Sequence, residues 1–343
     1  MKKLRVAVIG LGSIVPMHIT PILHFDDAEL VAVCDVKEDR AKKAGQKYNV
    51  PYYLDYKELI IKEKPDIVHI CTPHYLHPII SKFALENGVN PLSEKPMSIS
   101  LEDAEENVKI AEQKGLKYGV ILQCRYNDAS QLVKKHIMDG SLGKVLAARV
   151  VLTWYRPDSY YAESDWKGTW DKEGGGVIID QAIHSLDLAN WFIDDEPVSV
   201  QSCLFNRNHK VMEVEDTGEG FVKYKNGATL AFWAMNNYAC NEPIEIRLLC
   251  ENGRAVLSYE EARIEFNNGQ VLSVRQSIDP SIVYENAQDY WGFQHIKQIR
   301  QFYDSVKNNT EPEISGKEAL KIQKIVSEIY KNNAGQKFSK KSV

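Results

Sequence analysis

Three side chains of this sequence offer acid–base chemistry: Lys95, Asp180 and His184. Asp180 and His184 are four residues apart in a stretch with a helical pattern, so their side chains share one helix face. A carboxylate beside an imidazole orients the ring and supports its protonation. A partly desolvated Lys95 can share a proton relay or stabilise a developing alkoxide. We interpret the three as the catalytic group of an alcohol oxidation, in which the hydroxyl loses its proton as hydride leaves the carbon.

Each of these residues also has a plainer interpretation. His184 alone fits a helix histidine whose hydrogen bonds are satisfied by Asp180, and Lys95 alone fits a solvated loop lysine. Asp187, three residues beyond His184, remains near the same helix face. A dinucleotide-binding pattern in the same chain weighs against the plainer interpretations, because it supplies a hydride acceptor for the acid–base group.

That pattern is a glycine-rich turn that follows the first predicted strand and opens a helix: Gly10-Leu-Gly12-Ser13-Ile14-Val15. Gly10 allows a tight turn, and Gly12 lets a pyrophosphate approach the N–H groups at the helix N-terminus. Val15 stands where such fingerprints have a third glycine. Asp35 ends the second predicted strand about twenty residues on, as the fingerprint requires. We predict a dinucleotide site that includes Gly10, Gly12, Ser13, Ile14 and Asp35.

Asp35 bears on the choice of cofactor. A carboxylate there accepts hydrogen bonds from both ribose hydroxyls of NAD and repels the extra phosphate of NADP. The alternative is an aspartate that only caps a turn or helix. Lys37 and Arg40 lie nearby, and their positive charges reduce the preference for NAD over NADP. We expect NAD as the cofactor, with NADP less favoured.

Other residues follow the ends of later strands, where open α/β sheets bind their ligands. Those expected at the nicotinamide end of the cofactor are Cys71, Thr72, Pro73, His74, His77, Glu94, Lys95 and Gln123. The spacing of Cys71, His74 and His77 also suits a metal ion. No fourth ligand cluster stands out, however, and a zinc thiolate site usually needs one. We therefore expect no metal.

Aromatic residues crowd the segment from Trp154 to Trp170. Aromatic faces stack on the C–H faces of sugar rings, and polar side chains read the hydroxyls. The alternative is that about half of them pack in the interdomain core, as we expect for Trp154. Arg125 or Arg156 could hold a phosphate or carboxylate of the substrate. The predicted substrate contacts are Lys95, Arg125, Tyr126, Arg156, Tyr160, Trp166, Trp170, Asp180 and His184.

The elements that would position these residues fall into two domains, 1–123 and 124–343. In the first, apolar strands alternate with amphipathic helices, which predicts a doubly wound α/β domain with a parallel sheet. The predicted strands are Leu4–Ile9, Leu30–Cys34, Ile67–Cys71, Val89–Ser93 and Tyr118–Leu122, and the helices are Lys37–Tyr48, His77–Asn87 and Leu101–Lys114.

The second domain has an α+β pattern with a large, mostly antiparallel sheet. Asn-Gly pairs at 226–227, 252–253 and 268–269 predict three hairpins. The predicted strands are Lys144–Arg156, Val198–Asn206, Thr217–Lys225, Ala228–Asn236, Ile244–Cys250, Arg254–Tyr259, Arg263–Asn267 and Gln270–Arg275, and the helices are Ala129–Asp139, Val177–Phe192, Tyr290–Asn308 and Gly316–Lys331. A loop is expected from Pro157 to Gly176, and the C-terminal helices are able to pack back on the first domain.

Composition limits the class of protein. The 343 residues are 44% hydrophobic and 26% charged, with a formal net charge of −5, as in soluble globular proteins of two domains. The mixed charges build no basic stripe for nucleic acid, and no apolar run has the length that spans a bilayer. The six cysteines are scattered in mostly apolar runs, which suits reduced thiols. We expect a cytoplasmic protein with neither nucleic acid nor membrane as partner.

Taken together, the motifs resemble the Gfo/Idh/MocA oxidoreductase family along nearly the whole chain. The shared marks are Gly10-x-Gly12 with His18, Cys71-Thr-Pro, Glu94-Lys95-Pro96, and Gly174-Gly-Gly with Asp180 and His184. The resemblance implies a Rossmann domain followed by a domain with a large open sheet, which is often buried in dimers or tetramers. It also implies that Lys95, Asp180 and His184 are catalytic and that the Lys95–Pro96 bond is a candidate for the cis form.

Within that family, Trp166-Lys-Gly-Thr-Trp170 with Glu173 is similar to enzymes that oxidise the 3-hydroxyl of hexopyranosides or of nucleotide-sugar uronates. The uronate enzymes often carry Asn at the position of Asp180, so the aspartate favours inositol and simple-sugar dehydrogenases. Val15 and His74 also depart from the usual pattern, in which a small residue and an asparagine stand there.

The expected function is NAD-dependent hydride transfer from a secondary alcohol of a sugar, cyclitol or sugar derivative, with C3 of a hexopyranoside among the candidates. The alternatives are a C1 aldose or diol dehydrogenase, and a non-catalytic regulator that binds a dinucleotide through the same fold. A regulator has no need of a base, so the presence of Lys95, Asp180 and His184 favours the enzyme. A homodimer or homotetramer formed through the C-terminal sheet is expected.

Overall fold

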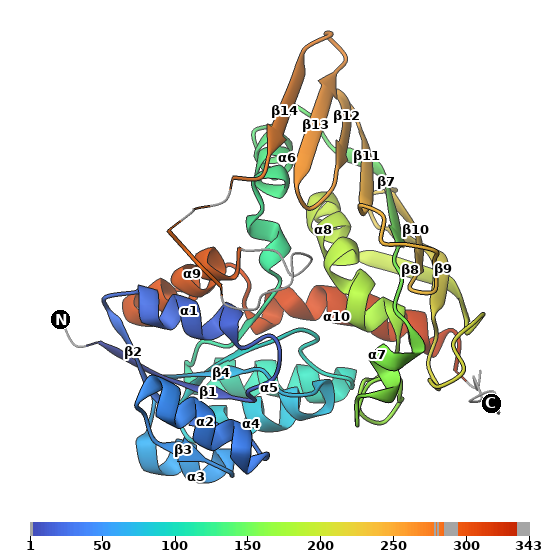
Figure 1. The fold of residues 1–343 in the computed structure, drawn as a ribbon. Helices are drawn as coiled ribbons and strands as arrows, with labels where there is room; N and C mark the ends of the chain where they lie inside the picture. The colour runs from blue at the N-terminus through green and yellow to red at the C-terminus, as the bar shows by residue number, and fades with distance from the viewer. Residues whose placement is uncertain (1–2, 278, 280, 285–293, 335–343) are drawn as a thin grey trace. The chain divides into compact units, whose positions relative to one another are not determined.

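The computed structural model describes residues 3–277, 279, 281–284 and 294–334. The chain divides into two compact units, each built on its own sheet (Figure 1). Unit 1 consists of Met1–Gln123 and Ile278–Gln323, and unit 2 of Cys124–Ser277 and Lys324–Val343. In the part of the chain that is described, no helix combines the length and the apolar character needed to cross a bilayer.

Unit 1 contains a six-stranded sheet in the order β3-β2-β1-β4-β5-β6, with every neighbouring pair parallel. This order, in which β1 and β4 meet at the point where the winding reverses, is that of the dinucleotide-binding fold. The expected doubly wound parallel domain is therefore confirmed. The strands are β1 (Leu4–Ile9), β2 (Ala28–Cys34), β3 (Tyr52–Tyr53), β4 (Ile67–Ile70), β5 (Asn90–Ser93) and β6 (Gly119–Val120).

Unit 1 also contains helices, most of which connect these strands. They are α1 (Pro16–His24), α2 (Glu38–Tyr48), α3 (Tyr56–Glu63), α4 (His77–Glu86), α5 (Leu101–Lys114) and, later in the chain, α9 (His295–Asn308), with the short 3₁₀ turn η1 at His74–Leu76. Local signals fix several ends: Ser100 accepts a hydrogen bond from the backbone N–H of Asp103, and Gly115 ends α5 with φ of 65°. The predicted helix Tyr290–Asn308 begins at His295 in the structure, and Tyr290–Phe293 lie outside the described residues.

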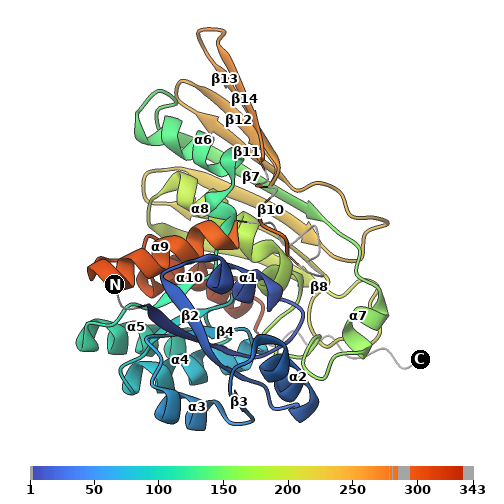
Figure 2. The same cartoon turned by 60° about the vertical axis from the view of Figure 1, so that its left-hand side comes forward.

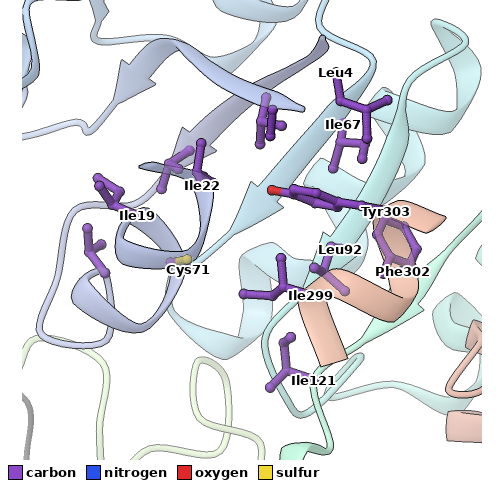
Figure 3. Packing of buried hydrophobic residues seen from close by; sticks show 14 residues of the cluster. Leu4, Ile19, Ile22, Ile67, Cys71, Leu92, Ile121, Ile299, Phe302 and Tyr303 are labelled. Atoms are coloured by element: carbon purple, nitrogen blue, oxygen red, sulfur yellow. The ribbon is translucent and has the colours of Figure 1, made fainter. Parts of the chain in front are cut away.

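The core of unit 1 lies on both faces of its sheet, because successive residues of β1 point in opposite directions. On one face, Val6 and Val8 belong to a cluster with residues of α1 and α9. Figure 3 shows Ile299, Phe302 and Tyr303 of α9 in this cluster. On the other face, the cluster includes residues of α3 and α4. Helix α9, which comes more than 170 residues after the last strand of this sheet, thus completes its hydrophobic core.

Unit 2 contains an eight-stranded sheet in the order β14-β13-β12-β11-β7-β10-β9-β8. Neighbours are antiparallel except β7 and β10, which run parallel, so the expected mostly antiparallel sheet is confirmed. The three predicted Asn-Gly hairpins join β9 to β10, β11 to β12 and β13 to β14. The strands are β7 (Val145–Thr153), β8 (Pro197–Phe205), β9 (Thr217–Tyr224), β10 (Thr229–Met235), β11 (Glu245–Cys250), β12 (Gly253–Leu257), β13 (Glu261–Phe266) and β14 (Val271–Arg275).

Helices α6 (Asp128–Met138) and α8 (Ile183–Ile193) pack against this sheet, α8 on β7 and β10 and α6 on the strands β12 to β14 (Figure 2). Two expectations need correction. The loop expected from Pro157 to Gly176 contains a short helix, α7 (Asp158–Ala162). The single helix expected over Val177–Phe192 is instead a π-helical turn, η3 (Ile178–Ala182), that continues into α8. The C-terminal helix α10 (Gly316–Lys331) has its first half in unit 1 and its second half in unit 2.

Candidate functional site

The glycine turn after β1 has the geometry that the sequence pattern predicts. Gly10 has φ of 89°, and a Cβ at this position would lie 2.6 Å from the carbonyl carbon of Cys71. A side chain is therefore excluded by both the backbone conformation and the close approach of the chain after β4. At Gly12, by contrast, a Cβ would have no heavy atom within 4 Å. The turn thus leaves open space at Gly12, where a pyrophosphate would approach the backbone.

Asp35 lies at the end of β2 and is only 8% exposed. Its Oδ2 accepts a hydrogen bond from the N–H of Leu11 at 2.8 Å, and its Oδ1 accepts one from the N–H of Lys37 at 2.8 Å. The carboxylate therefore supports the glycine turn, as the turn-aspartate alternative requires. Each oxygen of a carboxylate has a further lone pair, so the same side chain can still accept from ribose hydroxyls. The two interpretations of Asp35 are compatible.

The segment after β4 is tied to the loop after β5 through His77. Its Nδ1 lies 2.7 Å from the carbonyl oxygen of Pro96, and its Nε2 lies 2.8 Å from that of Thr72. Burial lowers the pKa of His77 despite these two contacts. His74 is buried beside it, and Pro73 precedes the turn η1. The ring of His77 thus brings the predicted Thr72-Pro73 and Lys95-Pro96 segments together.

The metal interpretation of Cys71, His74 and His77 receives no geometric support. Both ring nitrogens of His77 face backbone carbonyl oxygens. Burial raises the pKa of the Cys71 thiol well above its usual value. Among the described residues, a different group has potential ligand atoms within 4.8 Å of one another: His18, Glu94 and His295.

That second group belongs to a buried hydrogen-bonded cluster that includes Glu94, the first residue of the Glu94-Lys95-Pro96 motif. His18 Nε2 lies 2.9 Å from Glu94 Oε1, and His18 Nδ1 lies 2.9 Å from His69 Nδ1. His69 Nε2 in turn lies 2.9 Å from the hydroxyl of Tyr303. Burial alone would raise the pKa of Glu94, but hydrogen bonds from His18 and His295 outweigh it and hold that pKa well below its usual value. Hydrogen bonds therefore account for the arrangement of these side chains.

Sequence reasoning noticed His18 only as a family mark, and it missed His69, His295 and Tyr303. A buried polar residue inside an apolar strand, such as His69 in Ile67–Ile70, was the available signal. The motif itself has the expected backbone: the Lys95–Pro96 peptide bond is cis. Lys95 is half-buried. Gln123 is buried at the end of the first segment of unit 1.

In unit 2, the π turn η3 carries Asp180, and the first turn of α8 carries His184; both side chains are half-buried. The carboxylate of Asp180 accepts hydrogen bonds from the Tyr160 hydroxyl at 3.2 Å and from Gln181 Nε2 at 2.6 Å. Burial, reinforced by the charge of Asp180, raises the pKa of Tyr160 well above its usual value, so the phenol stays protonated and donates. That Asp180 also orients the imidazole of His184 stays a prediction.

Gln181 and Lys167 are site neighbours that sequence reasoning did not single out. Asn236 Nδ2 donates to Gln181 Oε1 at 3.0 Å, which leaves the amide nitrogen of Gln181 directed at Asp180. The ammonium of Lys167 donates to the Tyr160 hydroxyl and lies 3.5 Å from the centroid of that ring. Lys167 therefore donates to Tyr160, and Tyr160 donates to Asp180, which is the final acceptor of this series of hydrogen bonds.

The other predicted substrate residues differ in their burial and in their contacts. Arg125 is buried and forms a two-pronged ion pair with Asp187, with Nε–Oδ2 at 2.8 Å and Nη2–Oδ1 at 2.6 Å. A substrate anion would have to compete with Asp187 for this guanidinium. The guanidinium of Arg156 is buried, with its carbon 5.0 Å from a ring centroid of Trp154 and 5.7 Å from that of Tyr160. Tyr126, Trp166 and Trp170 are half-buried.

The predicted residues are thus grouped by unit. Unit 1 holds the glycine turn, Asp35, the segments joined by His77, and Lys95. Unit 2 holds Asp180, His184 and the aromatic segment. The fold and these groups fit a dinucleotide-binding oxidoreductase whose second unit holds the predicted acid–base residues.

Comparisons with known proteins agree with that class. Residues 4–122 match the family model described as "Oxidoreductase family, NAD-binding Rossmann fold". Residues 130–256 match the "GFO/IDH/MocA C-terminal domain". The chain belongs to the Gfo/Idh/MocA family, and its cofactor is NAD.

Relatives with known activities cover nearly the whole chain. D-glucoside 3-dehydrogenase of Escherichia coli strain K12 is 26% identical over 96% of this chain and 95% of its own length. Myo-inositol 2-dehydrogenase of Thermotoga maritima is 23% identical, with 92% of each chain covered. Among solved structures, the WlbA dehydrogenase from Bordetella pertussis in complex with NADH and UDP-GlcNAcA is similar with a TM-score of 0.83, 26% identity, and coverage of 98% of this chain and 99% of that one.

Proposed function

We propose that this protein oxidises a secondary alcohol of a sugar, cyclitol or sugar derivative to a ketone, with transfer of hydride to NAD. The observation that carries the proposal is the hydrogen-bonded Asp180 in the π turn directly before His184, in a chain whose other unit is an NAD-binding Rossmann unit. Acid–base residues of this kind serve a proton transfer that dinucleotide binding alone does not need.

Unit 1 is proposed to bind the cofactor and unit 2 to bind the substrate. The pyrophosphate would meet the backbone at Gly12, where the structure leaves room, together with Ser13 and Ile14. Asp35 would accept from the ribose hydroxyls and disfavour the phosphate of NADP. The nicotinamide would lie beside Gln123 and beside two segments, Thr72-Pro73 and Glu94-Lys95. These two segments are joined through His77.

Bound NAD supplies the hydride acceptor. The residues of this chain would handle the proton: His184 would remove it from the substrate hydroxyl, and Asp180 would support the imidazolium that forms. Asp180 is suited to this role because its donors, Tyr160 and Gln181, keep it hydrogen-bonded while it stays negative. Lys95, in unit 1, is proposed as a hydrogen-bond donor that lowers the energy of a developing alkoxide.

The substrate that the comparisons favour is a hexopyranoside oxidised at C3. Two relatives named for such chemistry match this chain, D-glucoside 3-dehydrogenase and glucose-6-phosphate 3-dehydrogenase. Aromatic residues Tyr160, Trp166 and Trp170 would stack on the pyranose ring. An inositol is the second candidate, since myo-inositol 2-dehydrogenase also matches along most of the chain.

A screen of glucosides, hexoses, inositols and their phosphates with NAD, followed by absorbance of the reduced nicotinamide, tests the proposal. NADH should accumulate with at least one of these cyclic polyols, and simple diols, tested in the same way, should give none. A protein that binds NAD tightly yet reduces it with none of these compounds would instead be the dinucleotide-binding regulator.

We also propose that the sheet of unit 2 joins copies of the chain. Trp233 in β10 and Leu249 in β11 are 38% and 55% exposed, although their strand neighbours Phe232 and Leu248 are buried. Light scattering in solution should give the mass of a dimer or tetramer, and Trp233→Arg should lower that mass.

Four of the six free cysteines are buried, which suits a reducing compartment such as the cytoplasm.

A further inference from the structure

The helix that carries Asp180 and His184 begins directly after three consecutive glycines. The first hydrogen bond within it runs from the N–H of Asp180 to the carbonyl of Gly176 at 3.0 Å. The N–H groups of residues 176–179 precede that bond, and the first four N–H groups of a helix need partners from elsewhere. All four find partners in just two residues of unit 2, which are distant in sequence from the helix.

Glu215, in the connection between β8 and β9, supplies three of these partners. Its carboxylate accepts from the N–H of Gly176 at 2.9 Å and from that of Ile178 at 3.1 Å. Its backbone carbonyl accepts from the N–H of Val177 at 3.1 Å. Glu215 has no exposed surface, so its carboxylate is held at the helix N-terminus without competing water.

Tyr330, in the second half of α10, supplies the fourth partner. Its hydroxyl accepts from the N–H of Ile179 at 3.2 Å and donates to Glu215 Oε1 at 2.9 Å. The phenol therefore links the fourth N–H group of the helix start to the carboxylate that holds two of the others. Its ring also meets that of Trp170 edge to face, with centroids 5.6 Å apart.

The glycines are explained by the same two residues. A Cβ at Gly175 would lie 2.0 Å from the Tyr330 hydroxyl, and Gly175 has φ of 152°. A Cβ at Gly176 would lie 1.9 Å from the carbonyl oxygen of Glu215, which is a backbone atom that cannot move aside. The absence of side chains at Gly175 and Gly176 thus leaves the space that Tyr330 and Glu215 occupy.

We propose that Glu215 and Tyr330 are positioning residues that fix the π turn carrying Asp180 by holding the four free N–H groups at the start of its helix. The proposal rests on the proposed function, since it assigns a purpose to the position of Asp180 and His184. π turns are uncommon and are frequent at functional sites. Here the turn needs a fixed start, because a shift of the helix start would move Asp180 relative to the hydroxyl of Tyr160, which lies on another element.

Two variants test this, Tyr330→Phe and Glu215→Gln. The first removes only the hydroxyl, and the second replaces one acceptor oxygen by a donor that faces other donors. Hydrogen–deuterium exchange should show lost protection of residues 176–182 in both variants. With the active polyol, kcat should fall roughly tenfold to a hundredfold, as for a slightly displaced catalytic group. The KM for NAD should stay within about twofold, because the cofactor contacts are in unit 1.

Matched controls are Tyr224→Phe and Asp216→Asn. Tyr224 donates its hydroxyl to Asn190, further along the same helix, at 3.1 Å. Asp216 is a buried carboxylate that accepts N–H groups of a different loop, those of Arg207 and Asn208. Both controls lose a comparable hydrogen bond, but they should keep the exchange protection of 176–182 and the kcat of the unaltered protein.

Wild-type protection and kcat in Tyr330→Phe would overturn the proposal, as would equal losses in the controls. If Glu215→Gln fails to fold, the single hydroxyl lost in Tyr330→Phe still decides. If the unaltered protein oxidises no polyol, the proposed function fails on its own. The exchange measurement then separately shows whether Glu215 and Tyr330 hold the helix start.

Discussion

His18 Nε2 and Glu94 Oε1 lie 2.9 Å apart in the interior of unit 1, where both side chains are buried. The low pKa of Glu94 makes its carboxylate an acceptor, so His18 Nε2 is the donor. Burial lowers the pKa of His18 and of His69 and keeps them neutral. Each neutral ring has one N–H and one acceptor nitrogen. The Tyr303 hydroxyl therefore donates to His69, His69 donates to His18, and His18 donates to Glu94.

Replacing the donor of this pair should destabilise unit 1. In His18→Leu the carboxylate of Glu94 loses one of its donors in the interior, and such a loss costs about 1–3 kcal/mol. Chemical denaturation at pH 7 should show this decrease in the free energy of unfolding. His24→Leu, an exposed position on the same helix α1, is the control and should change stability little. Equal stability of the two variants would contradict the assignment of the donor.

The two glycines of the turn after β1 should respond differently to alanine. Gly10→Ala should cost roughly 1–3 kcal/mol or more of stability, because a left-handed backbone and a collision with the Cys71 carbonyl oppose the methyl group. Gly12→Ala meets no protein atom and should fold normally, yet it should bind NAD poorly. Thermal unfolding without cofactor and calorimetric titration with NAD separate the two effects. Normal NAD binding by Gly12→Ala would place the pyrophosphate elsewhere.

Asp35→Ala should weaken the binding of NAD and reduce the difference in affinity between NAD and NADP. Hydrogen bonds to a charged acceptor contribute about 1.5–3 kcal/mol, which corresponds to roughly a tenfold to hundredfold change in Kd. Asp39→Ala, in the first turn of the neighbouring helix α2, is the control. Binding constants for both nucleotides, measured with each variant, give the ratio. An unchanged ratio would leave Asp35 with only its role in supporting Leu11 and Lys37.

His184→Ala should lower turnover by roughly 10²–10⁴-fold, the usual contribution of a general base. Its affinity for NAD should stay near that of the unaltered protein. His136→Ala, a histidine on helix α6 of the same unit, is the control and should keep full activity. Steady-state rates together with NAD titrations make the comparison. Normal turnover by His184→Ala would move the base to another residue.

Glu215 should give the protein a pH-dependent stability. Burial raises its pKa from the usual 4.5 to about 7 in the folded state. Between these two values the folded chain binds more protons than the unfolded chain, so this group's contribution to the free energy of unfolding decreases as pH rises through that window. Glu215→Gln should flatten that part of the stability curve, measured by denaturation across the window. A curve with the same slope as that of the unaltered protein would show that Glu215 does not titrate there.

Features encoded by neighbouring residues could be predicted from the sequence. Each Asn-Gly pair sits between two β-rich runs and defines a hairpin locally. The glycine turn and Asp35 lie in one βαβ unit, where strand order and helix direction follow from chirality. Short elements were missed: Tyr52–Tyr53 is too brief to show an alternation, and α3 has only eight residues.

Features that depend on contacts between distant segments could not be predicted. The π turn is visible only once Glu215 and Tyr330 are placed at the start of its helix, and Tyr330 is 151 residues away from Ile179. The partners of Asp180 come from the aromatic segment and from the adjacent Gln181, whose direction is set by Asn236 in turn. The His18–Glu94 cluster likewise draws on α9, which no local pattern connects to β4.

The distance in sequence between Ile179 and Tyr330 has a consequence for biosynthesis. A ribosome that adds about 5–20 residues per second needs roughly eight to thirty seconds to travel from one to the other. Through most of that interval Glu215 is already synthesised, but the Tyr330 hydroxyl that binds the N–H of Ile179 is not. A polypeptide released before position 330 would keep every proposed acid–base side chain and still lack the last support of the helix that presents two of them.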